Sequence, residues 1–138
     1  MTRVDFQQLT RLRLREARRL LAANLAAGAY YLTGHAVECA LKACVARQTR
    51  RHDFPDKNRA RESWDHDLNK LLSLADLQKA LDNDAKQRRQ LAINWAVVKD
   101  WQNASRYQPH ITRQQADALY RAVSSRNDGV IRWIRQHW

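Results

Sequence analysis

The sequence has little glycine, proline or cysteine, and each shortage excludes a class of structure. Its 138 residues include three glycines, two prolines and two cysteines. So few helix-breaking residues, and no run of alternating β-branched residues, exclude a strand-rich fold and favour helices. Cys39 and Cys44 lie five residues apart without a CxxC spacing, which argues against a disulfide framework and a zinc site. We expect both to be buried, reduced thiols of a cytoplasmic protein.

Long apolar runs are also absent. Residues 20–37 carry no acid, lysine or arginine, but they are rich in alanine and include Asn24, Thr33 and His35. This stretch is too weakly apolar to span a bilayer, so it predicts a buried helix. The first residues are charged and no apolar segment follows them, so we expect no signal peptide and no membrane contact.

Acidic residues are outnumbered by basic ones. Lysine and arginine total 25 against 14 acidic residues, which gives a net charge of +11. Most of the positive charge is arginine, whose planar fork suits phosphate. The charge favours a nucleic acid or a nucleotide as the partner, and charge alone does not separate RNA from DNA or from an acidic protein. A solvated basic surface without a ligand is the alternative.

The apolar periodicity predicts an all-α fold: a single domain over residues 1–138, folded as an up-and-down bundle of four to five helices. Gly28 marks either a helix break or a close helix–helix approach. Thr112 and Gln115 form a capping box that opens the last helix. Charged residues and Pro55 predict a mobile loop over residues 48–63. The helices are expected over residues 5–26 and 29–47, from 65 to 77, from 83 or 84 to 98, and from 112 onward with an interruption at 125–129.

One polar stripe interrupts the otherwise apolar second helix. Tyr31, His35, Glu38 and Lys42 follow one another at spacings of four, three and four, so they share a face. The stripe is either a satisfied polar seam, with Glu38 paired to Lys42, or a site in which Glu38 orients an arginine or a catalytic group.

A second candidate lies in residues 101–111, where Pro109 prevents a continuous helix. Arg106 could bind a phosphate, and Trp101 or Tyr107 could stack on a base. His110 could transfer a proton, because imidazole exchanges protons near neutral pH. Alternatively, the two aromatic residues pack this segment onto the core, and Arg106 pairs with an acid. The chain has no glycine-rich phosphate loop and no paired metal carboxylates, so we expect neither a metal nor a cofactor.

Together these segments resemble the HEPN superfamily over about residues 10–135. The most specific part is YYLTGHAVECALKA at residues 30–43. Supporting parts are ARRLL at 17–21, HDLNKLL at 66–72, Trp101, and SRY at 105–107. The resemblance implies a helical bundle that dimerises. It also implies either a metal-independent ribonuclease, often a toxin paired with a small nucleotidyltransferase antitoxin or a part of phage defence, or a non-catalytic RNA- or nucleotide-binding module.

The family's catalytic motif is an arginine, four to six residues and a histidine, facing a polar residue on the second helix. Glu38 matches the polar position and Arg106 the arginine, but His110 follows Arg106 after only three residues. The literal spacing occurs at Arg61 and His66, before the third helix and outside the family's order.

Three functions follow as hypotheses. In a ribonuclease, His110 would act as general base or acid, Arg106 would stabilise the phosphorane charge, and Glu38 would hold Arg106. In a binding module, the same residues, with Tyr107, Trp101, Lys42, His35 and Tyr31, would hold RNA or a nucleotide without cleavage. In an interaction module, the arginine-rich face of the first helix would dock on an acidic partner.

Overall fold

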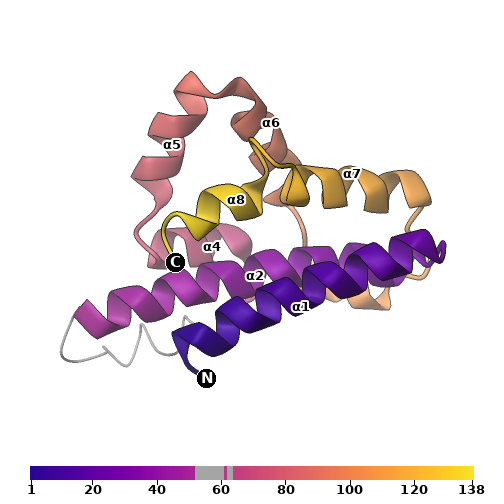
Figure 1. Ribbon diagram of the computed structural model, residues 1–138, viewed down its shortest axis with the longest axis horizontal. Helices are drawn as coiled ribbons and strands as arrows, with labels where there is room; N and C mark the ends of the chain where they lie inside the picture. Colours follow the sequence, from indigo (N-terminus) through magenta and orange to yellow (C-terminus); the bar gives the residue numbers. More distant parts are fainter. Residues whose placement is uncertain (52–60, 62–63) are drawn as a thin grey trace.

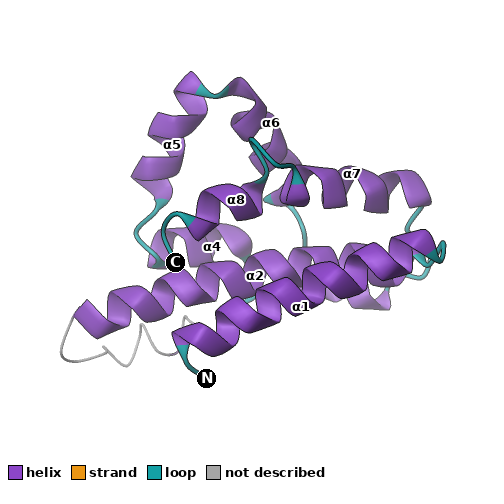
Figure 2. Ribbon diagram, viewed as in Figure 1, coloured by secondary structure: helices purple, strands orange, loops and turns teal. Residues whose placement is uncertain are grey.

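The chain is all-helical wherever the computed structural model describes it, which is at residues 1–51, 61 and 64–138. This described part contains seven α-helices, one short 3-10 helix and no strand (Figure 2), as the sequence predicts. None of its helices is long and apolar enough to cross a membrane. The elements are α1 (Arg3–Ala22), α2 (Ala26–Arg51), α4 (Leu68–Leu74), α5 (Gln78–Gln87), α6 (Arg89–Val98), η1 (Asn103–Tyr107), α7 (Arg113–Ser124) and α8 (Val130–Arg135).

Helices α1 and α2 form an antiparallel hairpin along one side of the molecule (Figure 1). The turn between them is closed by Asn24, whose φ of 61° lies in the left-handed region. The Asn24 N–H donates to the carbonyl of Leu21, and the Leu25 N–H donates to that of Leu20. These two bonds are those of a Schellman motif, in which asparagine here takes the place usually held by glycine. The helix break therefore lies at Asn24.

Gly28 lies inside α2, and of its two predicted roles the close approach is the one observed. A Cβ atom at this position would lie 3.1 Å from Cδ1 of Leu20 on α1. Helix α2 also extends farther than expected, through Arg51. The predicted loop over residues 48–63 is thus wrong for its first four residues, and most of the remainder lies outside the described residues.

The predicted third helix, over residues 65–77, ends earlier than expected, at Leu74, and the chain turns at Asp76, whose φ is 59°. Its N–H donates to the carbonyl of Ser73, and the Leu77 N–H donates to that of Leu72, which repeats the Schellman geometry. The N-cap of α4 is Asp67, which accepts hydrogen bonds from two backbone N–H groups, and not Asp65 as expected. Asp65 instead accepts from the Asp67 N–H.

The predicted fourth helix begins later than expected, at Arg89. Asn83 and Asp84 lie within α5, and the break falls at Arg88, whose backbone (φ −121°, ψ 86°) is not helical. The Arg88 guanidinium pairs with Asp128 at 2.6 Å, which ties this junction to the loop before α8. Relative to the five helices predicted, the described part has two more: α5, which ends at the break at Arg88, and α8, which the interruption at residues 125–129 separates from α7. Figure 1 shows α5 rising steeply away from the α1–α2 hairpin.

The last third of the chain agrees with the sequence analysis. Thr112 and Gln115 form the predicted capping box at the start of α7. The interruption expected at residues 125–129 separates α7 from α8. Before α7, the segment with Pro109 contains only the five-residue η1.

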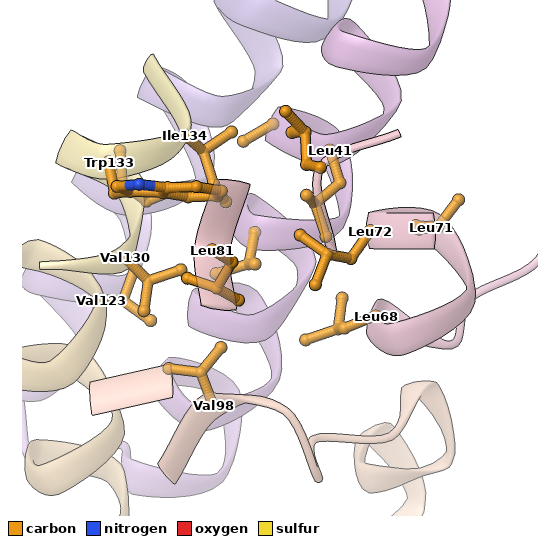
Figure 3. Close-up of a cluster of buried hydrophobic side chains, with 14 of the residues drawn as sticks. Leu41, Leu68, Leu71, Leu72, Leu81, Val98, Val123, Val130, Trp133 and Ile134 are labelled. Carbon is orange, nitrogen blue, oxygen red and sulfur yellow. The ribbon is translucent and has the colours of Figure 1, made fainter. Parts of the chain in front are cut away.

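The main core lies where α2 and the helices from α4 onward meet. Buried side chains from α2, α4, α5, α6, α7 and α8 point toward one another in Figure 3. A smaller cluster of Leu21, Ala29 and Ala116 joins α1 and α7 to α2. Helix α2 is therefore the central element, because it supplies apolar residues to both clusters.

Gly34 fixes how the segment before η1 sits on α2. Trp101 is buried, and its ring occupies the space where a Cβ of Gly34 would be, 2.1 Å from ring atoms Cε2 and Nε1. Only glycine allows the indole to lie this close to the helix.

We predict that Gly34→Ala lowers the free energy of unfolding by about 1–3 kcal/mol, because the new methyl group displaces the buried indole. The matched control is Gly28→Ala. There the methyl group meets only the end of the Leu20 side chain, and alanine gains up to about 1 kcal/mol of helix propensity. Urea unfolding of both variants tests this. Equal effects in the two variants would contradict it.

Candidate polar site on α2

The predicted polar stripe exists, and we call Tyr31, His35, Glu38 and Lys42 the α2 seam. Its residues lie on one face of α2, where η1 and α4 also pack against this helix. Glu38 is 2% exposed in the middle of this face. Such a carboxylate is stable only if cationic or hydrogen-bonding groups offset its lost hydration.

Three side chains surround the Glu38 carboxylate. Its Oε1 atom accepts hydrogen bonds at 2.8 Å from Nζ of Lys42 and at 2.8 Å from Nδ1 of His66. Its Oε2 atom lies 3.8 Å from Nδ1 of His35, at ion-pair distance. The predicted Glu38–Lys42 pair therefore exists, and the same carboxylate oxygen also contacts His66.

These contacts shift the pKa values of two seam residues in opposite directions. Burial alone would raise the pKa of Glu38, but the nearby His35 and the hydrogen bonds from Lys42 and His66 outweigh it and lower the pKa to about 2. The pKa of His35 is raised to about 9, first by its contact with Cys39 (Sγ–Nε2 3.6 Å) and then by Glu38. At neutral pH these values correspond to a carboxylate at Glu38 and an imidazolium at His35.

His66 is the residue of this cluster that the sequence analysis did not place in the site. It immediately precedes the α4 N-cap, and its side chain is half exposed. With Nδ1 held by Glu38, the other ring nitrogen, Nε2, is the one available to a ligand. The signal in the sequence was Glu38 itself, because an acid in the middle of an apolar helix requires a partner. Which residue becomes this partner depends on the packing of α4 against α2.

Three rings lie in series along the η1 side of the seam. Tyr31 stacks on His35 and on Trp101, with centroid distances of 5.9 and 6.0 Å. The Tyr31 hydroxyl donates to Oδ1 of Asn103 at 3.5 Å. Trp101 is 2% exposed, so it anchors this segment and has no ring face open to a base, contrary to its predicted role as a stacking residue.

Arg106 and Tyr107 are both exposed at the end of η1. The guanidinium lies over the Tyr107 ring, 4.8 Å from its centroid, and Tyr107 is 74% exposed. The pKa of Arg106 is raised by its contact with Tyr107 and, to a smaller extent, with Tyr31. These two residues therefore offer a phosphate-binding group beside an aromatic face.

Arg106 does not pair with Glu38 among the described residues, although we expected it to. Arg106 neighbours Tyr31, which precedes Glu38 by seven residues, or about 10 Å along α2. Arg106 therefore lies near the Tyr31 end of the α2 seam, whereas Glu38 lies in its middle. The structure therefore assigns the orienting contact of Glu38 to His66.

His110 is exposed and takes part in none of the hydrogen bonds, ion pairs or ring contacts found in the described part of the chain. Nothing orients its imidazole, whereas His66 is held by a buried carboxylate. Of the two histidines, His66 is the better placed for proton transfer.

Comparisons with protein-family models, with curated proteins and with solved structures give no match to this chain. Within residues 1–51, 61 and 64–138, no three histidine, cysteine or acidic side chains are grouped as a metal site would require.

The raised pKa of His35 predicts how stability depends on pH. Its charge stabilises the folded chain fully below about pH 6.5, and this contribution is lost as the pH rises through about 9. We therefore expect His35→Gln to lower the melting temperature clearly at pH 6 and much less near pH 10. Thermal unfolding of both proteins across this range measures the difference. A difference that stays constant with pH would contradict the prediction.

Proposed function

We propose that this chain is a HEPN-type, RNA-directed protein that cleaves RNA without a metal ion, with His66 as its proton-transfer residue. The observation that carries the proposal is the hydrogen bond between the buried carboxylate of Glu38 and Nδ1 of His66. A carboxylate in this position fixes the imidazole and stabilises its protonated form. The second nitrogen of the ring is then directed toward a substrate.

The surface charge supports RNA as the substrate class. The net charge of +11 attracts a polyanion, and the exposed Arg106–Tyr107 pair offers a contact for one phosphate and one base. Tyr31 connects this pair to the middle of the seam through its stack on His35. A short single-stranded segment along this face would contact both Arg106 and His66.

The proposed chemistry uses only groups of the chain and the RNA. His66 Nε2 accepts the proton of a ribose 2′-hydroxyl, whose oxygen then attacks the adjacent phosphorus. The bond from phosphorus to the 5′-oxygen breaks, and this oxygen takes a proton from water. The products are a 2′,3′-cyclic phosphate and a free 5′-hydroxyl, and the imidazolium returns its proton to solvent. Arg106, or the arginine of a second copy, would stabilise the charge on the phosphorane.

A non-catalytic RNA- or nucleotide-binding module is the second candidate. It is favoured by the separation along α2 between Arg106, beside Tyr31, and the Glu38–His66 pair. In the ribonuclease proposal, a homodimer could bring the arginine of one chain to the histidine of the other. The dimer predicted from the resemblance is therefore part of that ribonuclease proposal. A small nucleotidyltransferase antitoxin as physiological partner stays a prediction.

The decisive variants are His66→Asn and His110→Asn. An asparagine amide can still donate to Glu38 from near the position of Nδ1, but it cannot accept a proton. We expect His66→Asn to slow the cleavage of single-stranded or transfer RNA by about 10²–10⁴-fold at nearly unchanged RNA affinity. His110→Asn should cleave like the wild type. The reverse pattern would refute the assignment of His66, and wild-type protein that leaves RNA intact would reduce the function to binding.

Arg106→Ala should weaken the binding of single-stranded RNA by about fivefold to tenfold and reduce the salt dependence of binding by about one phosphate contact. Arg89→Ala is the matched control, because Arg89 is exposed at the start of α6, the helix that separates it from η1. Fluorescence anisotropy at several salt concentrations measures both effects. Equal losses in the two variants would mean that only the total charge matters.

A further inference from the structure

A second surface feature lies on a neighbouring face of α2, where this helix meets α1. A hollow of about 520 Å³ opens there. Its lining includes Leu32, which follows Tyr31 directly and so lies about 100° around the helix from it. The hollow is therefore beside the α2 seam and not part of it. Its lining residues are Leu12, Arg15, Glu16, Arg19, Leu20 and Leu32.

The floor of the hollow is apolar. Leu12, Leu20 and Leu32 form it, and Leu12 remains 37% exposed. Leu12 and Leu20 are eight residues apart on α1, which places them about 12 Å apart along the helix. Two turns of a partner helix could therefore lay leucine-sized side chains along this floor.

The rim of the hollow is basic. Arg15 and Arg19 are exposed and four residues apart, so they lie on the same side of α1. Neither takes part in an ion pair within the described part of the chain. The acid of the rim, Glu16, is neutralised by Arg13 at 2.5 Å. The rim thus presents two positive charges without acidic partners above an apolar floor.

We propose that this hollow is a docking groove for an acidic amphipathic helix of a protein partner. Apolar residues of that helix would fill the leucine floor, and acids spaced by one turn would meet Arg15 and Arg19. RNA fits less well, because the floor has neither an aromatic ring for stacking nor a polar group to read a base edge. The inference concerns a separate face and is independent of the RNA-directed function.

The test uses the full chain and a synthetic peptide of about 18 residues, long enough to be helical. The peptide carries leucines along one face and glutamates beside them, and a second peptide has lysine in place of each glutamate. We expect the acidic peptide to bind and to shift the methyl NMR signals of Leu12, Leu20 and Leu32. The double variant Arg15→Glu, Arg19→Glu should lose at least about tenfold in affinity for it and gain affinity for the lysine peptide.

The matched control is Arg89→Glu with Arg126→Glu, which changes the net charge equally at two exposed sites near the α5–α6 junction and before α8. It should bind the acidic peptide like the wild type. The proposal is overturned if both double variants lose affinity equally or if the peptide leaves the three leucine signals unmoved. It is also overturned if single-stranded RNA shifts these signals, or if the groove proves to be filled by a second copy in a dimer that Leu12→Arg dissociates. RNA cleavage by His66 is measured separately, so either proposal can fail alone.

Discussion

The arrangement of the site depends on one buried carboxylate. Glu38 loses nearly all of its hydration inside the bundle, and it stays ionised only because Lys42, His66 and His35 surround it. Lys42 and His35 belong to the same helix, but His66 comes from the segment that begins α4. The carboxylate therefore does two things. It neutralises charges within α2, and it fixes the position of α4 relative to this helix.

The residues on the η1 side of the seam are positioned by packing and not by charge. The absence of a side chain at Gly34 lets Trp101 lie against α2, and the indole in turn supports Tyr31. Arg106 follows Trp101 closely in the chain, so its place beside Tyr31 results from this contact. A glycine and a glutamate four residues apart thus bring two distant segments to one face of a single helix.

The sequence could predict what depends on neighbours along the chain, and little that depends on packing between helices. Helix content, the shared face of Glu38 and Lys42, and the Thr112 capping box follow from spacing alone, and each is confirmed. The breaks at Asn24 and Asp76 were predicted a few residues too late, because both residues adopt a backbone conformation that is usually a sign of glycine. The contact between Glu38 and His66 spans 28 residues and requires knowing where α4 lies.

A cluster of this kind is an expensive way to hold helices together. Apolar side chains of similar volume would join α2 to α4 at least as well, without the cost of removing a carboxylate and its partners from water. The present cluster even leaves Oε2 of Glu38 and Nδ1 of His35 without a direct hydrogen bond within the described part of the chain. What the polar arrangement adds is an imidazole with a fixed orientation at the surface, beside a permanent cation. The stability of the fold does not require such an imidazole, whereas proton transfer or anion binding does. This contrast is the physical reason to seek the function of the chain at Glu38 and His66.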